Sequence, residues 1–209
     1  MSGLNDVVDL SRWDGKVNWS VFKDHKPGGV IVRSSYAGRT LDDLWLRDRL
    51  IVNSMSVPYG IYHVPSPDNQ LWLETSILDL VILAEPTPQF VGLDLEIYHR
   101  GLPSRALDLA YHVTDNYNIP VFIYTNWDFR NKYSDLAFPK QLYTFPLWVA
   151  HWTAKPVPLI PKGWKDYVLW QYSADGNKLG LSWGVQARDI DLNRVHPAYG
   201  SLANYLETR

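Results

Sequence analysis

The chain has no cysteine and no long apolar run, and each absence narrows the kinds of protein that it can be. Without cysteine there is no disulfide framework and no thiolate metal site, so the fold must be held by packing. No segment approaches the roughly 20 apolar residues that cross a bilayer as a helix. The first residues also lack the apolar core of a secretory signal. We therefore expect neither membrane insertion nor a signal peptide.

A strongly basic segment is also missing. The formal net charge is −2 over 209 residues, and Lys and Arg do not cluster into a run. Proteins that bind nucleic acid present a basic stripe to its phosphates, so we expect no nucleic-acid partner. Apolar residues make up 46% of the chain and charged residues 20%, which predicts one well-filled domain over residues 1–209.

Two carboxylates stand in an otherwise apolar, strand-like run. Asp94 and Glu96 belong to the segment FVGLDLEIY at 90–98. Side chains at i and i+2 of a strand point to the same face, about 6 to 7 Å apart, so the two share one environment. Their repulsion raises one of the two pKa values. A protonated carboxyl beside an ionised one is what glycoside hydrolysis needs. A divalent-cation site or a buried polar pair would give the same pattern.

Segments rich in β-branched and aromatic residues recur along the chain, with helical spacing between several of them. The expected strands are 7–10, 29–34, 59–64, 90–97, 120–125, 147–152, 167–172 and 189–193. The expected helices are 41–55, 69–83 and 104–116, with a short helical turn at 19–25. Strands that alternate with helices predict βαβ units around a parallel sheet. Eight of them predict an α/β fold, a modified TIM-type (β/α) barrel.

Two connections in the last third of the chain lack a clear helical pattern. Residues 155–163 are rich in proline and 174–184 in glycine, so we expect an incomplete outer ring of helices. An open, doubly wound sheet is the structural alternative. The Gly-x-Gly-x-x-Gly loop that usually follows the first strand of that fold is absent here.

Polar and aromatic side chains gather where the expected strands end, which is where barrel enzymes build their active sites. Four of them are carboxylates: Asp9, Asp94, Glu96 and Asp191. Any single aspartate is more often a cap or a turn residue. Four within apolar strands are costly unless they act together. We therefore predict that the four converge on one mouth of the barrel.

These residues lie in motifs that resemble, in order, those of the family 25 glycoside hydrolases, the Chalaropsis-type lysozymes. The motifs are DLSRWDG at 9–15 with NW at 18–19, DLE at 94–96, YTN at 124–126, LWVA at 147–150, WQYS at 170–173 and DLN at 191–193. The resemblance runs from about Asp6 to Arg194, whereas segments 31–36 and 62–67 match only loosely. It implies a barrel that hydrolyses the β-1,4 bond between N-acetylmuramic acid and N-acetylglucosamine in bacterial cell-wall peptidoglycan.

The resemblance also implies roles for the four carboxylates. Glu96 corresponds to the general acid and Asp94 to its electrostatic partner, while Asp9 and Asp191 line the cleft. Neighbouring negative charges would raise the pKa of Glu96 toward the working pH. Two routes stay open. The substrate's own acetamido group could attack with help from Asp94, or Asp9 or Asp191 could activate water on the opposite face.

Rings at strand ends can stack on sugars, and hydroxyl or amide groups can bind an acetamido group. The candidates for such substrate contacts are Tyr62, Tyr124, Trp148, Trp152 and Gln171. The tryptophans could instead close the barrel. No His-Glu-x-x-His pattern occurs, so we expect no catalytic metal and no cofactor.

Other classes of protein remain as hypotheses. A non-catalytic, lysozyme-like module could bind peptidoglycan or serve in a virion, and a cation-binding protein could use the same carboxylates. Retention of all four carboxylates favours the enzyme. Since no wall-binding domain is expected after Arg194, targeting would come from other virion or wall-targeting proteins. We expect a phage-encoded endolysin or virion lysozyme, with a trimmed secreted bacterial enzyme as the alternative.

Overall fold

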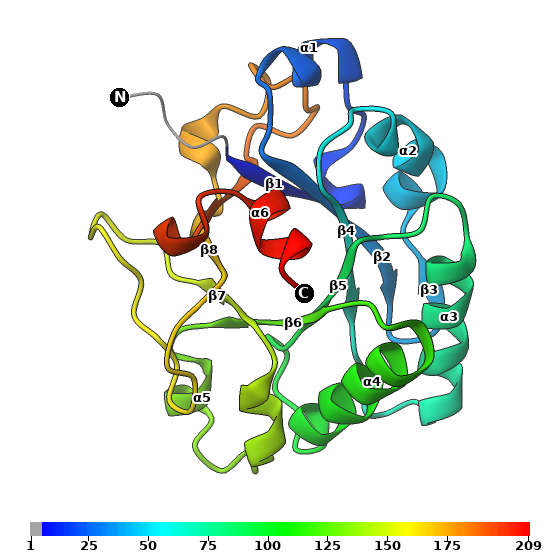
Figure 1. The fold of residues 1–209 in the computed structure, drawn as a ribbon, viewed down its shortest axis with the longest axis vertical. Helices are drawn as coiled ribbons and strands as arrows, with labels where there is room; N and C mark the ends of the chain where they lie inside the picture. Colours follow the sequence, from blue (N-terminus) through cyan, green and yellow to red (C-terminus); the bar gives the residue numbers. More distant parts are fainter. Residues whose placement is uncertain (1–5) are drawn as a thin grey trace.

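A closed barrel of eight β-strands forms the centre of the computed structural model, which describes residues 6–209 (Figure 1). The barrel strands are β1 (Val7–Leu10), β2 (Gly29–Tyr36), β4 (Tyr59–Val64), β5 (Phe90–Asp94), β6 (Val121–Asn126), β7 (Leu147–Ala150), β8 (Leu169–Ser173) and β9 (Asp191–Val195). The ring closes because β1 pairs with both β2 and β9. The short strand β3 (Thr40–Leu41) pairs with β2 outside the ring. The predicted barrel of eight strands is confirmed.

One strand runs against the others. The seven strands from β1 to β8 in the ring are parallel, but β9 is antiparallel to both β8 and β1. The expectation of a wholly parallel sheet is therefore wrong at β9. A parallel strand needs a crossover, usually a helix, and residues 174–190 contain only a short 3₁₀ turn. As a result Asp191, the first residue of β9, lies at the end of the barrel where the parallel strands finish. We call this end the mouth.

The predicted strand bounds match the observed bounds at some strands and differ from them at others. Segments 7–10 and 59–64 have their predicted bounds. The predicted strand at 90–97 ends at Asp94, and the one at 189–193 is displaced to Asp191–Val195. Glu96 therefore lies beyond its strand, in the loop that follows β5.

The helices cover only part of the barrel, as predicted. The outer side of β2 to β6 is packed by α2 (Asp43–Asn53), α3 (Leu71–Leu83) and α4 (Leu102–Tyr117) (Figure 1). The remaining helices are α1 (Trp19–Asp24), α5 (Phe129–Lys132) and α6 (Leu202–Glu207), with 3₁₀ turns at Arg12–Asp14, Lys140–Thr144, Gly176–Lys178 and Pro197–Tyr199. Within residues 6–209, no helix combines the length and apolar character needed to cross a bilayer.

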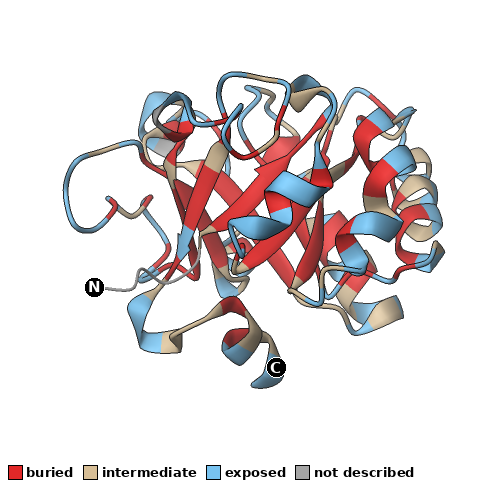
Figure 2. Cartoon of the chain, turned by 90° about the horizontal axis from the view of Figure 1, so that it is seen from above, coloured by how far each residue is buried: buried red, intermediate tan, exposed pale blue. Residues whose placement is uncertain are grey.

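Apolar side chains fill the barrel below the mouth, so its centre is a packed core. Most of the barrel strands are accordingly coloured as buried in Figure 2. Leu202 and Tyr205 of α6 pack against this core at the end opposite the mouth. Two glycines give the large rings room: a Cβ at Gly60 would overlap the Phe90 ring. A Cβ at Gly92 would lie 3.2 Å from the ring of Trp148. The filled interior leaves the mouth as the part of the barrel that a substrate can reach.

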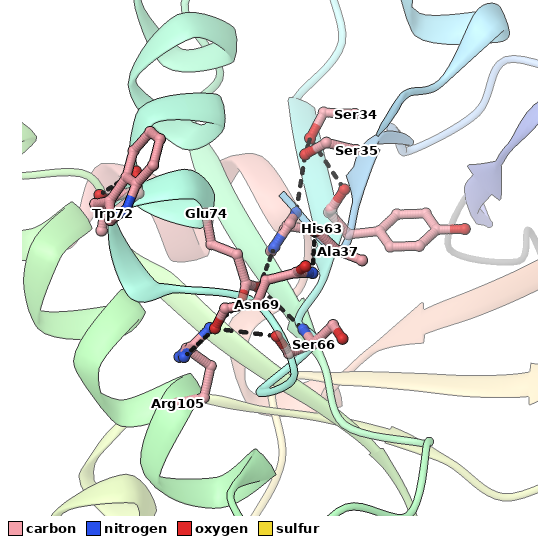
Figure 3. Close-up of polar contacts among 11 residues, drawn as sticks. Ser34, Ser35, Ala37, His63, Ser66, Asn69, Trp72, Glu74 and Arg105 are labelled. Atoms are coloured by element: carbon pink, nitrogen blue, oxygen red, sulfur yellow. Dashed lines mark hydrogen bonds and ion pairs between the residues drawn. The ribbon is translucent and has the colours of Figure 1, made fainter. Parts of the chain in front are cut away.

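A buried network of hydrogen bonds and an ion pair connects β2 and β4 to the helices α3 and α4 (Figure 3). Glu74 of α3 accepts hydrogen bonds from His63 Nε2 at 2.9 Å and from the backbone N–H of Ser66 at 3.0 Å. It also forms an ion pair with Arg105 of α4. His63 Nδ1 lies 2.9 Å from Ser35 Oγ. The order serine, histidine, carboxylate is that of a hydrolase triad, but all three side chains are fully buried, so this network is structural.

The network predicts that Glu74→Gln strongly destabilises the fold. The substitution leaves the guanidinium of Arg105 without its buried counter-charge, which costs about 3 kcal/mol of the free energy of unfolding. Denaturant titration measures this loss. Glu207→Gln, at an exposed position of α6, is the control and should change stability by less than about 0.5 kcal/mol. Equal stabilities for the two variants would contradict a structural role for the network.

Candidate active site

The four predicted carboxylates gather at the mouth of the barrel. Asp9 and Asp191 are directly paired across β1 and β9, Asp94 ends β5, and Glu96 follows two residues later. Each of the four is coupled electrostatically to at least one of the others. No group of three or more His, Asp or Glu side chains in residues 6–209 has an arrangement that could hold a metal ion.

Asp9 is held by neutral amide donors. Its carboxylate accepts a hydrogen bond from Asn193 Nδ2 at 2.7 Å, and Gln171 Nε2 lies 3.2 and 3.4 Å from its two oxygens. Burial raises the pKa of Asp9, while the bonds from Asn193 and Gln171 act in the opposite direction. Hydrogen bonds to the charged form favour ionisation. The orientation of the Asp9 carboxyl is therefore fixed by two side chains that cannot themselves titrate.

A second layer of side chains orients these amides. Trp148 Nε1 donates to Asn193 Oδ1 at 2.6 Å. The Tyr124 hydroxyl and Trp152 Nε1 donate to Gln171 Oε1 at 2.9 and 3.1 Å. These contacts set which face of each amide points at the carboxylate of Asp9.

The residues predicted to contact substrate are therefore not equivalent. The side chain of Trp148 is 1% exposed and packs against Tyr124 inside the barrel, with ring centroids 4.6 Å apart. It cannot stack on a bound sugar in this structure, because its strand position points into the filled core. Trp152 is 55% exposed and offers an accessible ring at the rim. Tyr62 is half-buried, while Tyr124 and Gln171 lie just beneath the mouth.

Asp94 and Glu96 occupy different environments. Asp94 is buried, and its Oδ1 atom has no hydrogen-bond partner among the described residues. Burial, followed by the charges of Glu96 and Asp9, raises the pKa of Asp94, and the positive charge of Arg33 lowers it. The Glu96 side chain reaches solvent, yet the protein atoms around its carboxyl raise its pKa to about 7 against a hydrogen bond with Tyr124. Glu96 is thus a solvent-accessible carboxyl that exchanges a proton near neutral pH.

The structure adds a fifth carboxylate to the cluster. Asp14 accepts the backbone N–H of Ser11 at 2.7 Å, and burial raises its pKa to about 7. Burial, then the charges of Asp9 and Asp14, raise the pKa of Asp191 to about 10. The sequence placed Asp14 within a motif but gave it no role. The feature of the sequence that could have drawn attention to Asp14 is its position three residues after Ser11, which is typical of a capping box.

Arg33 is the other residue that sequence reasoning missed. It lies on β2, and its Nε donates to Asp42 at 2.7 Å. The available signal was a lone arginine two residues after Ile31, in a strand whose preceding residues are all apolar. That pattern places a charge on the inner face of the barrel.

Two hollows lie among the segments that follow the parallel strands. One of about 620 Å³ is lined by residues that follow β7, including Trp152, and by the end of β8 with the residues after it, including Tyr172. A smaller one of about 120 Å³ lies beside the loops that follow β4 and β5, including Tyr98. A third groove, of about 570 Å³, lies beside α6 at the opposite end of the barrel and has no part in this site.

A barrel whose mouth carries coupled carboxylates beside an exposed aromatic ring has the features of a glycoside hydrolase. Residues 8–181 match the glycosyl hydrolases family 25, and the chain belongs to this family. It is therefore a glycoside hydrolase, as the resemblance in its motifs implied.

Relatives share both the sequence pattern and the fold. Lysozyme M1 of Streptomyces globisporus is 25% identical over 218 residues, which cover 95% of this chain and 69% of that protein. The bacterial lysozyme from Streptomyces coelicolor superposes with a TM-score of 0.77 at 21% identity, covering 99% of this chain and 97% of the other. The catalytic domain of endolysin ply40 from bacteriophage P40 of Listeria monocytogenes gives a TM-score of 0.74 at 21% identity, with 100% of both chains covered.

The crowding of carboxylates predicts that Asp191→Asn stabilises the protein. The folded-state pKa of Asp191 is about 10 against an ordinary value of 3.8, so the unfolded chain ionises first as pH rises. The wild type therefore loses stability between about pH 4 and pH 10, and the variant does not suffer this loss. Thermal unfolding at about pH 5, 7 and 9 should show a melting-temperature gain that widens with pH.

Asp189→Asn is the matched control for this measurement. Asp189 is exposed and lies two residues earlier in the chain. Its substitution should leave the melting temperature nearly unchanged at every pH. A difference between wild type and Asp191→Asn that stayed constant with pH would contradict the assigned protonation.

Proposed function

We propose that this glycoside hydrolase is a lysozyme that cleaves the β-1,4 bond between N-acetylmuramic acid and N-acetylglucosamine in bacterial peptidoglycan. Glu96 is the general acid and Asp94 is its partner. The observation that carries the proposal is the pairing of an accessible carboxyl of pKa about 7 with a buried carboxyl from the same strand end. Membership of family 25 and the similarity to Lysozyme M1 support the substrate.

The reaction begins with proton transfer. Glu96 donates its proton to the glycosidic oxygen, and the leaving sugar departs as an alcohol. Positive charge then develops on the remaining sugar. This positive charge favours the ionised forms of the neighbouring Asp94 and Asp9 carboxyls, which in turn stabilise it. A pKa of about 7 keeps a large fraction of Glu96 protonated at neutral pH, which this step requires.

The environments of the carboxylates favour attack by the substrate's own acetamido oxygen. Asp94 would orient that group, because Asp94 and Glu96 approach the sugar from the same strand end. The inverting route needs an ionised base on the opposite face. Asp191, with a pKa of about 10, is protonated at neutral pH, and Asp9 already accepts bonds from two amides. In the favoured route, water then opens the cyclic intermediate with Glu96 acting as the base.

Substrate binding is assigned to the rim. The exposed ring of Trp152 adjoins the 620 Å³ hollow and is placed to stack on a sugar. The hydroxyls of Tyr62 and Tyr124 lie at or just beneath the mouth, where they can reach a polar substituent. Gln171 and Trp148 act mainly by orienting Asp9, directly and through Asn193.

The place of action follows from the substrate. We assign the enzyme to the bacterial cell wall and favour a phage-encoded protein. The fold shared with the catalytic domain of endolysin ply40 supports this origin. A non-catalytic module that binds peptidoglycan is the competing hypothesis, and the following experiment separates the two.

Mass spectrometry of the products from purified peptidoglycan tests the function. Wild-type protein should release fragments that end in reducing N-acetylmuramic acid. Glu96→Gln keeps the shape of the side chain but cannot donate an acidic proton, so the rate should fall by about 10²- to 10⁴-fold while binding to peptidoglycan is retained.

Asp6→Asn is the carboxyl control. Asp6 accepts the hydroxyl of Tyr172 at 2.9 Å, and an asparagine oxygen can accept the same bond. This variant should keep its activity. Products that end in N-acetylglucosamine would change the bond assignment, and intact glycan chains bound by the wild type would support the non-catalytic module.

A further inference from the structure

A small recess with two arginines in its wall lies at the rim of the mouth beside β2. Its lining consists of Arg12, Arg33, Tyr36, Thr40, Leu41 and Asp42. These residues come from the turn after β1, from β2 and β3, and from the start of α2. The recess is shallow, with a volume of about 10 Å³, which is roughly the space that one water-sized group needs. A single carboxylate oxygen therefore fits it, whereas a sugar ring does not.

Arg33 is a fixed cation in the wall of this recess. Its side chain is 11% exposed, and its Nε donates to Asp42 Oδ2 at 2.7 Å. The Asp42 carboxylate also accepts the backbone N–H groups of Arg12 at 3.1 Å and of Leu44 at 2.9 Å. Within residues 6–209 the Nη atoms of Arg33 have no hydrogen-bond partner, and neither is sealed from solvent. They are thus positioned donors that an acceptor from outside can reach.

Arg12 places a second guanidinium at the same recess. The guanidinium carbon lies 4.8 Å from the centroid of the Trp13 ring, which is itself 73% exposed. The turn that carries both residues is held by Asp14, which accepts the backbone N–H of Ser11 at 2.7 Å. No carboxylate among the described residues forms an ion pair with the Arg12 guanidinium. Two guanidinium groups at one recess repel each other, so an anion bound there would be stabilised by both.

A larger hollow adjoins the recess at Tyr36, which lines both. This hollow has a volume of about 120 Å³, and its apolar lining includes Pro65, Pro67, Ile97, Tyr98 and Leu102. The two residues that directly follow Glu96 in the chain belong to this lining. Asp68, the acidic residue of the hollow, is paired with His99 at 3.0 Å. A ligand that runs from Glu96 along this hollow therefore meets apolar surface first and the two arginines next.

We propose that the recess between Arg12 and Arg33 binds a carboxylate of the peptide stem of peptidoglycan, and that the adjoining hollow takes the small side chains of that stem. The inference rests on the proposed function, because it names a further part of the same substrate. The stem is a short peptide with methyl side chains and free carboxylates, attached to N-acetylmuramic acid. Guanidinium groups with fixed N–H donors match the geometry of a carboxylate. The carboxylates of the mouth repel such an anion, whereas this side of the rim attracts it.

Two substrates that differ in the stem test the inference. One is soluble glycan strands that carry their peptides, and the other is the same strands after an amidase has removed the peptides. Wild-type protein should have about tenfold higher kcat/KM on the peptide-bearing strands, mainly through a lower KM. Arg12→Gln and Arg33→Gln should each reduce this ratio toward one. Arg33→Lys keeps the charge and should retain most of the preference.

Arg209→Gln is the matched control. Its guanidinium lies over the Tyr205 ring at the opposite end of the barrel, 4.8 Å from the ring centroid, so this variant should keep the wild-type ratio. A wild type that cleaves both substrates equally well overturns the inference. An equal loss on both substrates in Arg12→Gln also overturns it, because the arginine would then serve the glycan or the fold. Arg12 is exposed and binds Asp42 only through its backbone, so this variant decides the question even where Arg33→Gln fails to fold.

A binding measurement separates this inference from the proposed function. Glu96→Gln should bind the peptide-bearing strands about tenfold more tightly than the stripped strands, and adding Arg12→Gln should remove the difference. This comparison needs no cleavage. If the wild type cleaved neither substrate, the proposed function would fail while the two dissociation constants still decided the role of the recess. If it cleaved both but the dissociation constants were equal, the function would stand and the inference would fail.

Discussion

Repulsion among carboxylates at the barrel mouth is the interaction on which the other features of the site depend. Burial and mutual repulsion raise the pKa values of Asp94, Glu96 and Asp191 together. An isolated loop would relax by moving these charges apart. The closed ring prevents this, because β1 pairs with both β2 and β9 and sets Asp9 directly opposite Asp191. The folded state therefore stores unfavourable electrostatic energy where the chemistry takes place.

The carboxyl groups of the mouth have different surroundings. Asp9 accepts hydrogen bonds from the neutral amides of Asn193 and Gln171. Burial and the charges of Glu96 and Asp9 raise the pKa of Asp94, whose Oδ1 has no hydrogen-bond partner among the described residues. Glu96 reaches solvent with a pKa of about 7. Chemically similar carboxyl groups thus acquire different pKa values from their different surroundings. This difference lets one member donate a proton while another stabilises positive charge.

Sequence reasoning succeeded where a local pattern is sufficient. Segments rich in β-branched and aromatic residues indicated the strands, and the Asp-x-Glu spacing located the paired carboxylates. The direction of β9 could not be predicted, because it depends on how residues 174–190 return to the sheet. The buried position of Trp148 and the inward position of Arg33 depend on register between strands far apart in sequence. The apolar side of the short helix α6 is recognisable only against the end of the barrel that it covers.

The central claim is that Glu96 supplies the proton to the departing sugar. A series of aryl glycoside substrates whose leaving groups become steadily more acidic tests it most directly, because a good leaving group departs without protonation. The account predicts that the rate deficit of Glu96→Gln shrinks along the series, while that of Asp94→Asn does not. A deficit of Glu96→Gln that stayed the same for every leaving group would contradict its assignment as the general acid.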